Sequence, residues 1–446
     1  ADPFLIVKQN PQHVAQELSP LVHVPVLTLL GKLTKPHTGW QPIASRIPTA
    51  VAKQIVKLNI NGITMTPDTK RVYPRSWAAS QVIGWTAPWD GQGVSGLEYY
   101  YNKALSGTTG IRKVVDDAIG QPISIDTVKP TVGGQTLRLT IDAALQDEVE
   151  QVLAGVGAQY QPKGATAIVM NPQTGAILAL ANWPRVNAND PSGAPYWAQE
   201  DRATGFTYEP GSTFKAVTVA GALSDGLVTP STVFTIPPVL QVADRQIHDA
   251  EAHGYESLSV AGILRVSSNI GADLIGAKLG PTRFDYWVRR FGFGTPTGVD
   301  LPGEAAGYIL HPSQYSGSSM GNLPFGQGES VTPMQMATAY AAIANGGVLR
   351  PPHIVQAIGG KLVRTPAGHR IISTTTAAEL RQMLRGVYGE GGTASGASIQ
   401  GYDMAGKTGT SNVVVNGHYS SSLFVASFVG MVPANNPQLL GLVVVD

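Results

Sequence analysis

The sequence contains no cysteine, and this absence removes several kinds of chemistry at once. Disulfide bonds, a thiolate nucleophile and cysteine-ligated zinc are all excluded for these 446 residues. An excess of charge of one sign is missing too, because 31 basic residues face 30 acidic ones and the formal net charge is +1. A charge so balanced gives no indication of nucleic acid or an anionic membrane as the main partner, and we expect no nucleic-acid partner.

Long hydrophobic runs are also absent. No window approaches the roughly 18 apolar residues of a membrane-spanning helix, and no signal-peptide pattern follows Ala1. The chain does not begin with methionine, and residues 441–446 form an apolar strand pattern that stops abruptly. We therefore expect the sequence to be a piece of a longer protein, and any membrane anchor would have to lie outside it.

The length of the sequence and its changing pattern of apolar residues, proline and glycine predict two domains. Residues 1–136 mix short apolar runs with scattered proline and glycine, which predicts an irregular α+β domain whose clearest helical patterns cover residues 11–18 and 48–58. Near Leu137 the pattern changes to a short strand, followed by a helix that Asp142 caps. We therefore predict a second domain over residues 137–446.

Two predicted hairpins define the second domain. Apolar strands at 165–170 and 176–180 are joined by a turn containing proline and glycine, and strands at 424–431 and 439–445 repeat this design. Hairpins at both ends of one domain predict a single antiparallel sheet built from strands distant in sequence. Helices are predicted between them, near 377–388 and, most clearly, after a Thr332 capping box, so the fold class is α+β.

The stretch from Glu209 to Lys215 is the strongest candidate for catalysis. Proline and glycine precede Ser212, and an apolar helical pattern follows it. Residues three apart on a helix share a face, so Lys215 is predicted to lie within hydrogen-bond reach of the Ser212 hydroxyl. A serine needs such a neighbour, because its own hydroxyl is a weak nucleophile at neutral pH.

Two further short motifs follow in the chain, and each is weak evidence when taken alone. They are Ser267-Ser268-Asn269, in a predicted loop between helices, and Lys407-Thr408-Gly409-Thr410, ahead of an apolar strand. Together with Ser212-Thr213-Phe214-Lys215, and in this order, they match the signature of serine acyl transferases. Gly409 lies where a ligand would have to approach the strand closely.

This set of motifs resembles that of penicillin-binding proteins, specifically the class B, monofunctional D,D-transpeptidases of bacterial cell-wall synthesis. The resemblance covers nearly the whole chain, and the Ser-Ser-Asn triplet is similar to that of the cell-division subclass. It implies a serine β-lactamase-like transpeptidase domain behind a non-catalytic, dimerisation-type pedestal domain. The supporting segments are 71–74 and 93–98 in the first domain and 139–142, 164–184, 326–328 and 392–394 in the second.

Residue chemistry gives a mechanism consistent with this resemblance. Ser212 would attack a D-Ala-D-Ala amide carbonyl and hold the acyl group as an ester. Lys215 can be the base only if it is neutral, and both burial and the second cation, Lys407, would lower its pKa. Ser267 and Lys407 would then relay the proton to the leaving amine.

The resemblance also implies roles in substrate binding. The backbone N–H groups of Ser212 and Thr410 would form the oxyanion hole, Asn269 would hold the donor peptide, and Thr408 and Thr410 would bind its terminal carboxylate. Plainer interpretations stay open: Asn269 as a helix cap, Lys407 as a solvated edge-strand lysine and the threonines as β-formers.

Neither a cofactor nor a metal site is expected. The segment holding His248, Asp249, Glu251 and His253 has residue types that can bind zinc, but its spacing does not place two imidazoles on one helix face. We interpret it as a polar loop near the cleft.

The expected partners follow from the resemblance. They are peptidoglycan stem peptides as substrates, β-lactam antibiotics as covalent inhibitors and a membrane glycan polymerase bound through the pedestal, with the catalytic domain outside a bacterial cell membrane. The alternatives are a β-lactam sensor or hydrolase, disfavoured because no glutamate lies in a matching motif, and a scaffold that recruits division or elongation partners through residues 1–136.

Overall fold

The computed structural model describes residues 1–116, 122–365 and 367–446. It divides into two compact units, one formed by Ala1–Val72 with Pro88–Gly91 and the other by Tyr73–Ala87 with Gln92–Asp446. This division falls earlier in the chain than residue 136, so the predicted limits of the two domains stay a prediction. Among the described residues, no helix combines the length and the apolar character that crossing a membrane requires.

The first unit is helical. Its helices enclose a core of their own that includes Ile6, Leu18 and Leu29. Asn10 caps the second helix by accepting a hydrogen bond from the amide of His13, as expected for a helix that begins with proline. The helices are α1 (Pro3–Ile6), α2 (Pro11–Val22), α3 (Val26–Leu33) and α4 (Thr49–Lys57). The two predicted helical patterns are confirmed.

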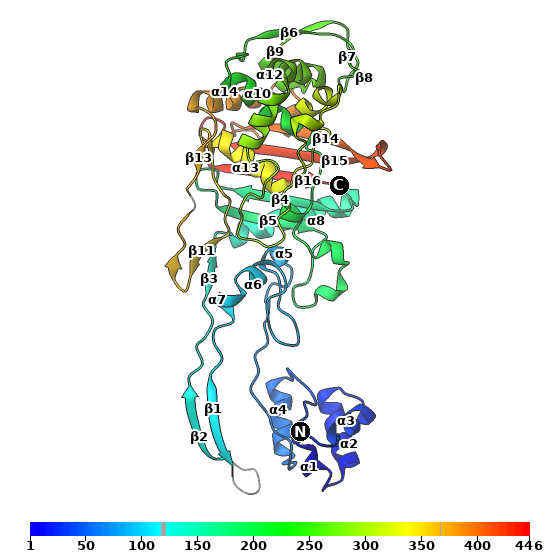
Figure 1. The fold of residues 1–446 in the computed structure, drawn as a ribbon, viewed down its shortest axis with the longest axis vertical. Helices are drawn as coiled ribbons and strands as arrows, with labels where there is room; N and C mark the ends of the chain where they lie inside the picture. The colour runs from blue at the N-terminus through cyan, green and yellow to red at the C-terminus, as the bar shows by residue number, and fades with distance from the viewer. Residues whose placement is uncertain (117–121, 366) are drawn as a thin grey trace. The chain divides into compact units, whose positions relative to one another are not determined.

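A five-stranded antiparallel sheet is the centre of the second unit (Figure 1). The predicted hairpins are confirmed, and they meet in the middle of the sheet, where Ala165 pairs with Val445. In spatial order the strands are β14 (Ala405–Val415), β15 (His418–Val432), β16 (Leu439–Val445), β4 (Ala165–Met170) and β5 (Ile177–Trp183). Strand β14 therefore lies at one edge, and among the residues that the structure describes no strand pairs with its outer side.

Helices cover this sheet because its strands alternate in burial. Ala165 and Val443 turn towards helix α8 (Ala143–Tyr160), while Ile168 and Leu442 join the main core on the other face. The predicted capping bonds form: Asp142 accepts from the first turn of α8, and Thr332 and Gln335 form the capping box of α13. The other main helices are α10 (Lys215–Ser224), α11 (Val260–Val266), α12 (Asn269–Arg290), α13 (Pro333–Ala344) and α14 (Thr374–Arg385).

The remaining elements are short. The helix predicted near 377–388 begins three residues earlier, as α14, and continues as a 3-10 turn to Tyr388. A hairpin of β1 (Ile111–Asp116) and β2 (Pro122–Lys129) precedes the main sheet in sequence. The smaller pairings join β3 (Leu137–Leu139), β11 (Val355–Ile358) and β12 (Lys361–Leu362); β6 (Val233–Ile236) and β9 (Glu256–Ser259); β7 (Leu240–Val242) and β8 (Arg245–Ile247); and β10 (Val348–Leu349) and β13 (His369–Arg370).

Candidate active site

Ser212 lies in a short 3-10 turn, Gly211–Phe214, that leads directly into α10. The turn is held at both sides, because the Thr213 hydroxyl donates to the carbonyl of Pro210 (2.8 Å) and the buried Tyr340 hydroxyl donates to the carbonyl of Thr213 (2.7 Å). Across the described residues, the Ser212 hydroxyl itself has no hydrogen-bond partner. A rigid turn thus presents a hydroxyl that is free to react.

Two glycines let this turn approach strand β14. Gly211 has a φ of +54°, and a Cβ there would lie 2.8 Å from the carbonyl oxygen of Thr410. A Cβ on Gly409 would lie 2.5 Å from Ser427 Oγ and 2.9 Å from the Thr213 methyl group. The N–H and C=O of a strand residue point to the same side, so the Thr410 amide also faces the Ser212 turn.

Lys215 is fully buried, and its hydrogen bonds go to residues other than Ser212. Its Nζ donates to the carbonyl of Ser267 (2.5 Å), to Ser267 Oγ (3.2 Å) and to Asn269 Oδ1 (2.7 Å). The predicted hydrogen bond to Ser212 is not formed anywhere in the described structure. Catalytic hydrogen bonds often form only in the substrate complex, so this resting geometry leaves Lys215 available as a base.

Lys407, which lies on β14, also contacts Ser267. It is fully buried, and its Nζ donates to Ser267 Oγ (2.8 Å) and to the carbonyl of Thr408 (3.0 Å). Ser267 lies between the two lysines because it ends α11 in the left-handed conformation, with a φ of +62°. Such backbone conformations are uncommon for residues other than glycine and gather at functional sites.

Burial dominates the electrostatics of this cluster. Burial, and next the charge of Lys407, hold the pKa of Lys215 well below its ordinary value, while Asp249 and Asp273 act in the opposite direction. Burial lowers the pKa of Lys407 to about 7. Burial also raises the pKa of Asp273 to about 8, and within the described part of the chain neither of its carboxyl oxygens has a hydrogen-bond partner. Burial therefore favours the neutral form of both lysines, and for Lys215 the charge of Lys407 acts in the same direction.

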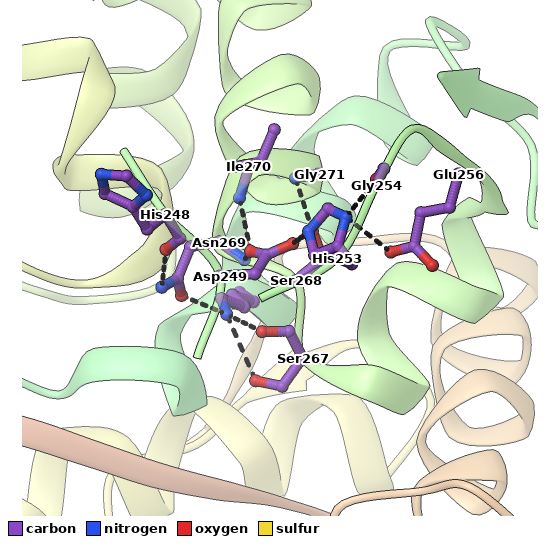
Figure 2. Close-up of polar contacts among 11 residues, drawn as sticks. His248, Asp249, His253, Gly254, Glu256, Ser267, Ser268, Asn269, Ile270 and Gly271 are labelled. Carbon is purple, nitrogen blue, oxygen red and sulfur yellow. Dashed lines mark hydrogen bonds and ion pairs between the residues drawn. The ribbon is translucent and has the colours of Figure 1, made fainter. Parts of the chain in front are cut away.

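The sequence patterns did not single out every residue of the site. The Thr393 hydroxyl lies 2.7 Å from that of Thr408, and the only signal for it was its place in the short segment 392–394. Asp249 was interpreted as part of a polar loop, and the structure places it on the Ser267-Ser268-Asn269 turn (Figure 2). Nothing in the local sequence pointed to Asp273.

The three motifs nevertheless converge. Lys215, Ser267, Asn269 and Lys407 form one hydrogen-bonded cluster, while Thr408, Gly409 and Thr410 follow the neighbouring stretch of β14 beside the Ser212 turn. Three short motifs distant in sequence therefore meet in a single site, in which the Ser212 turn lies against β14 and two buried amines share Ser267.

Family models match most of the chain. The Penicillin binding protein transpeptidase domain matches residues 165–446, and the Penicillin-binding Protein dimerisation domain matches residues 5–139. Among curated relatives, penicillin-binding protein PbpB of Mycolicibacterium smegmatis is 35% identical, over 94% of this chain and 67% of that protein. A probable peptidoglycan D,D-transpeptidase, PenA of Neisseria meningitidis, is 31% identical, over 97% of this chain and 73% of that protein.

Solved structures show the same similarity. The crystal structure of penicillin binding protein 3 from Mycobacterium tuberculosis complexed with aztreonam matches with a TM-score of 0.77 and 34% identity, covering 84% of each chain. The order of the matched domains, a dimerisation domain followed by a transpeptidase domain, is that of the resemblance drawn from the motifs. The chain therefore belongs to the class B penicillin-binding proteins.

Proposed function

We propose that this protein is a serine D,D-transpeptidase that crosslinks peptidoglycan stem peptides through an acyl-enzyme on Ser212. The observation that carries the proposal is the position of Ser267 Oγ, 3.2 Å from Lys215 Nζ and 2.8 Å from Lys407 Nζ. A hydroxyl between two buried amines can pass a proton from one to the other, as acyl transfer requires.

The acylation step uses these groups in sequence. Neutral Lys215 takes the Ser212 proton while the oxygen attacks the carbonyl carbon of the D-Ala-D-Ala amide. The C–N bond then breaks, and the departing D-alanine amine receives a proton from Ser267, which is replenished by Lys407. The backbone N–H groups of Ser212 and Thr410 hold the negative oxygen of the tetrahedral intermediate, and removing one such donor costs about 10²- to 10³-fold in rate.

Binding of the donor peptide prepares this step. In the resting site Asn269 Oδ1 accepts a hydrogen bond from Lys215 (2.7 Å). A substrate amide that binds Asn269 competes for that oxygen, which leaves Lys215 with one acceptor fewer and favours its neutral form. Thr408 and Thr410 bind the terminal carboxylate, and Gly409 lets the peptide approach the strand. The amine of a second stem peptide then attacks the ester, forming the crosslink and restoring the Ser212 hydroxyl.

The names of relatives support the substrate class. PenA is named as a probable peptidoglycan D,D-transpeptidase, and the penicillin binding protein 3 structures are described as complexes with aztreonam and with ampicillin. We extend this to the present chain: β-lactams acylate Ser212 in place of the stem peptide.

The remaining proposals concern the protein's binding partner and its location in the cell. We propose that residues 1–136 form the pedestal and bind a membrane glycan polymerase, while residues 137–446 act outside a bacterial cell membrane. The match of a dimerisation-domain model to residues 5–139 supports a role in association for this part of the chain.

Labelling with a fluorescent penicillin tests the proposed activity. We expect the wild-type protein to form a covalent adduct that survives denaturation, and Ser212→Ala to form none, because the attacking oxygen is gone. Labelling of Ser212→Ala would remove Ser212 as the nucleophile. The release of bound benzylpenicillin distinguishes the hydrolase alternative: a transpeptidase should hold the acyl group for many minutes, whereas release within seconds would favour a β-lactam hydrolase.

A further inference from the structure

The segment containing His248 and Asp249 lies against the Ser267-Ser268-Asn269 turn, although the two are far apart in sequence (Figure 2). The Asp249 side chain is only 9% exposed. One of its oxygens, Oδ1, accepts hydrogen bonds from the backbone N–H groups of Asn269 and of Ile270 (3.0 Å). The other, Oδ2, accepts from the Ser268 hydroxyl (2.7 Å).

These hydrogen bonds cap the N-terminus of α12. The first four N–H groups of a helix lack partners within the helix, and a negative charge is favourable at that end. Asp249 satisfies the first two of them, and Ser268 Oγ accepts from the third, that of Gly271 (2.8 Å). The helix that begins with Asn269 is therefore positioned by a carboxylate from outside the helix.

Hydrogen bonds on three sides hold Asn269 in place. Its backbone N–H is held by Asp249, its Nδ2 donates to the carbonyl of His248 (2.9 Å), and its Oδ1 accepts from Lys215 Nζ (2.7 Å). A continuous path of hydrogen bonds thus runs from the Asp249 carboxylate through Asn269 to the amine of Lys215.

We propose that Asp249 is a positioning residue for acyl transfer: it holds Asn269, and through it the amine of Lys215, in the resting geometry, and its negative charge opposes the loss of the Lys215 proton. This inference rests on the proposed function, and it assigns to the 248–256 segment a part in setting the pH at which the enzyme is active. Asp249 touches no reacting atom, so its effect is transmitted through Asn269 and by charge.

The charge effect has a definite sign. The ionisable groups that face Lys215 are Lys407 from β14, Asp249 from the 248–256 segment and Asp273 from α12. The charge of Lys407 favours the neutral form of Lys215, and the two carboxyl groups, where they are ionised, favour its protonated form. Removing the charge of Asp249 therefore lets Lys215 become neutral at a lower pH.

His253 has the opposite influence. Its Nε2 lies 3.1 Å from Asp249 Oδ2 and its Nδ1 lies 2.7 Å from the carbonyl oxygen of Gly254, so both ring nitrogens face acceptors. Only the doubly protonated ring can donate to both. The Gly254 carbonyl, followed by Asp249 and Glu256, raises the pKa of His253. A protonated His253 partly neutralises Asp249, and its removal leaves more negative charge acting on Lys215.

The test is the pH profile of acylation by a fluorescent penicillin, measured as a second-order rate constant from pH 5 to 9 on the full chain. For Asp249→Asn we expect the acid limb to move to lower pH by about half a unit or more, with a plateau roughly tenfold lower because Asn269 is less well held. For His253→Gln we expect a smaller shift to higher pH. Opposite shifts support the proposal; an Asp249→Asn profile identical to wild type overturns it.

Two control variants distinguish an effect of the Asp249 charge from an effect on folding. Ser268→Ala removes the Gly271 cap and one hydrogen bond to Asp249 but keeps the Asp249 charge, so it should lower thermal stability and leave the acid limb close to its wild-type position; a shift equal to that of Asp249→Asn would overturn the charge argument. Glu251→Gln removes one charge two residues away, from an exposed side chain without an ion pair in the described structure, and should leave the profile unchanged. Failure of the wild-type protein to label would instead refute the proposed function.

Discussion

The two sides of the candidate active site differ in how completely their polar groups are engaged. On the lysine side, Lys215 and Lys407 are fully buried and each donates to at least two oxygens. On the strand side, Thr410 is exposed, and its hydroxyl has no hydrogen-bond partner among the residues described. The proton-transfer groups are thus hydrogen-bonded before substrate arrives, whereas the Thr410 hydroxyl, one of the two proposed to bind the substrate carboxylate, has no partner until then.

The largest effect is expected for a variant on the lysine side of the site. Lys215→Arg keeps a positive charge but introduces a guanidinium that does not give up its proton at these pH values. We expect acylation by a fluorescent penicillin to fall by roughly 10²- to 10⁴-fold, the usual contribution of general acid–base catalysis. Lys278→Arg, on an exposed part of α12, is the matched control and should acylate normally. Near-normal acylation by Lys215→Arg would remove Lys215 from the role of base.

An intermediate effect is expected for a variant on the strand side of the site. Thr408→Val keeps the shape of the side chain and removes the hydroxyl proposed to bind the substrate carboxylate. A hydrogen bond to a charged group contributes about 1.5–3 kcal/mol, so the acylation rate constant should fall by roughly 10- to 100-fold.

Thr393→Val provides the comparison for that variant. The Thr393 hydroxyl contacts that of Thr408 at 2.7 Å, so it orients the binding group without being one, and its loss should cost less than tenfold. Equal losses in the two variants would mean that the two hydroxyls act as one unit, and the assignment of the carboxylate to Thr408 rather than Thr393 would be wrong.

The smallest effect on activity, but a clear one on stability, is expected for Asp273→Asn. Burial raises the pKa of Asp273 to about 8, whereas an aspartate in the unfolded chain has a pKa near 3.9. Between these values the folded protein binds more protons than the unfolded one, so this group's contribution to stability falls as the pH rises from about 4 to about 8.

The asparagine variant does not ionise, so it should lack this part of the pH dependence. Its free energy of unfolding relative to wild type should rise with pH across that window, by at most about 1.4 kcal/mol per pH unit. Urea unfolding at pH 4, 6 and 8 measures the slope. Parallel curves for the two proteins would show that Asp273 does not change its protonation on folding.

Local rules explain what the sequence could predict. The hairpins and the caps of α8 and α13 depend on residues within a few positions of one another, and all are confirmed. The convergence of the three motifs came from their order and from family resemblance. Their proposed roles in catalysis and binding stay predictions.

The features that were missed depend on contacts between distant segments. Asp249 caps a helix that begins 20 residues later, beyond the span of any capping rule, and Thr393 meets Thr408 from another element. Spacing alone put Lys215 within reach of Ser212, but a long flexible side chain turns towards the best acceptors, which Ser267 and Asn269 supply.

The order of strands in the central sheet also bears on how the enzyme is made. Strand β4 is synthesised early, but its partner β16 follows much later in the sequence, with Ala165 paired to Val445. A ribosome-bound chain that already carries Ser212 lacks both this partner and Lys407. Until translation supplies them, β4 exposes an unpaired edge that is prone to aggregation, and the capacity to react with penicillin arrives in one late step.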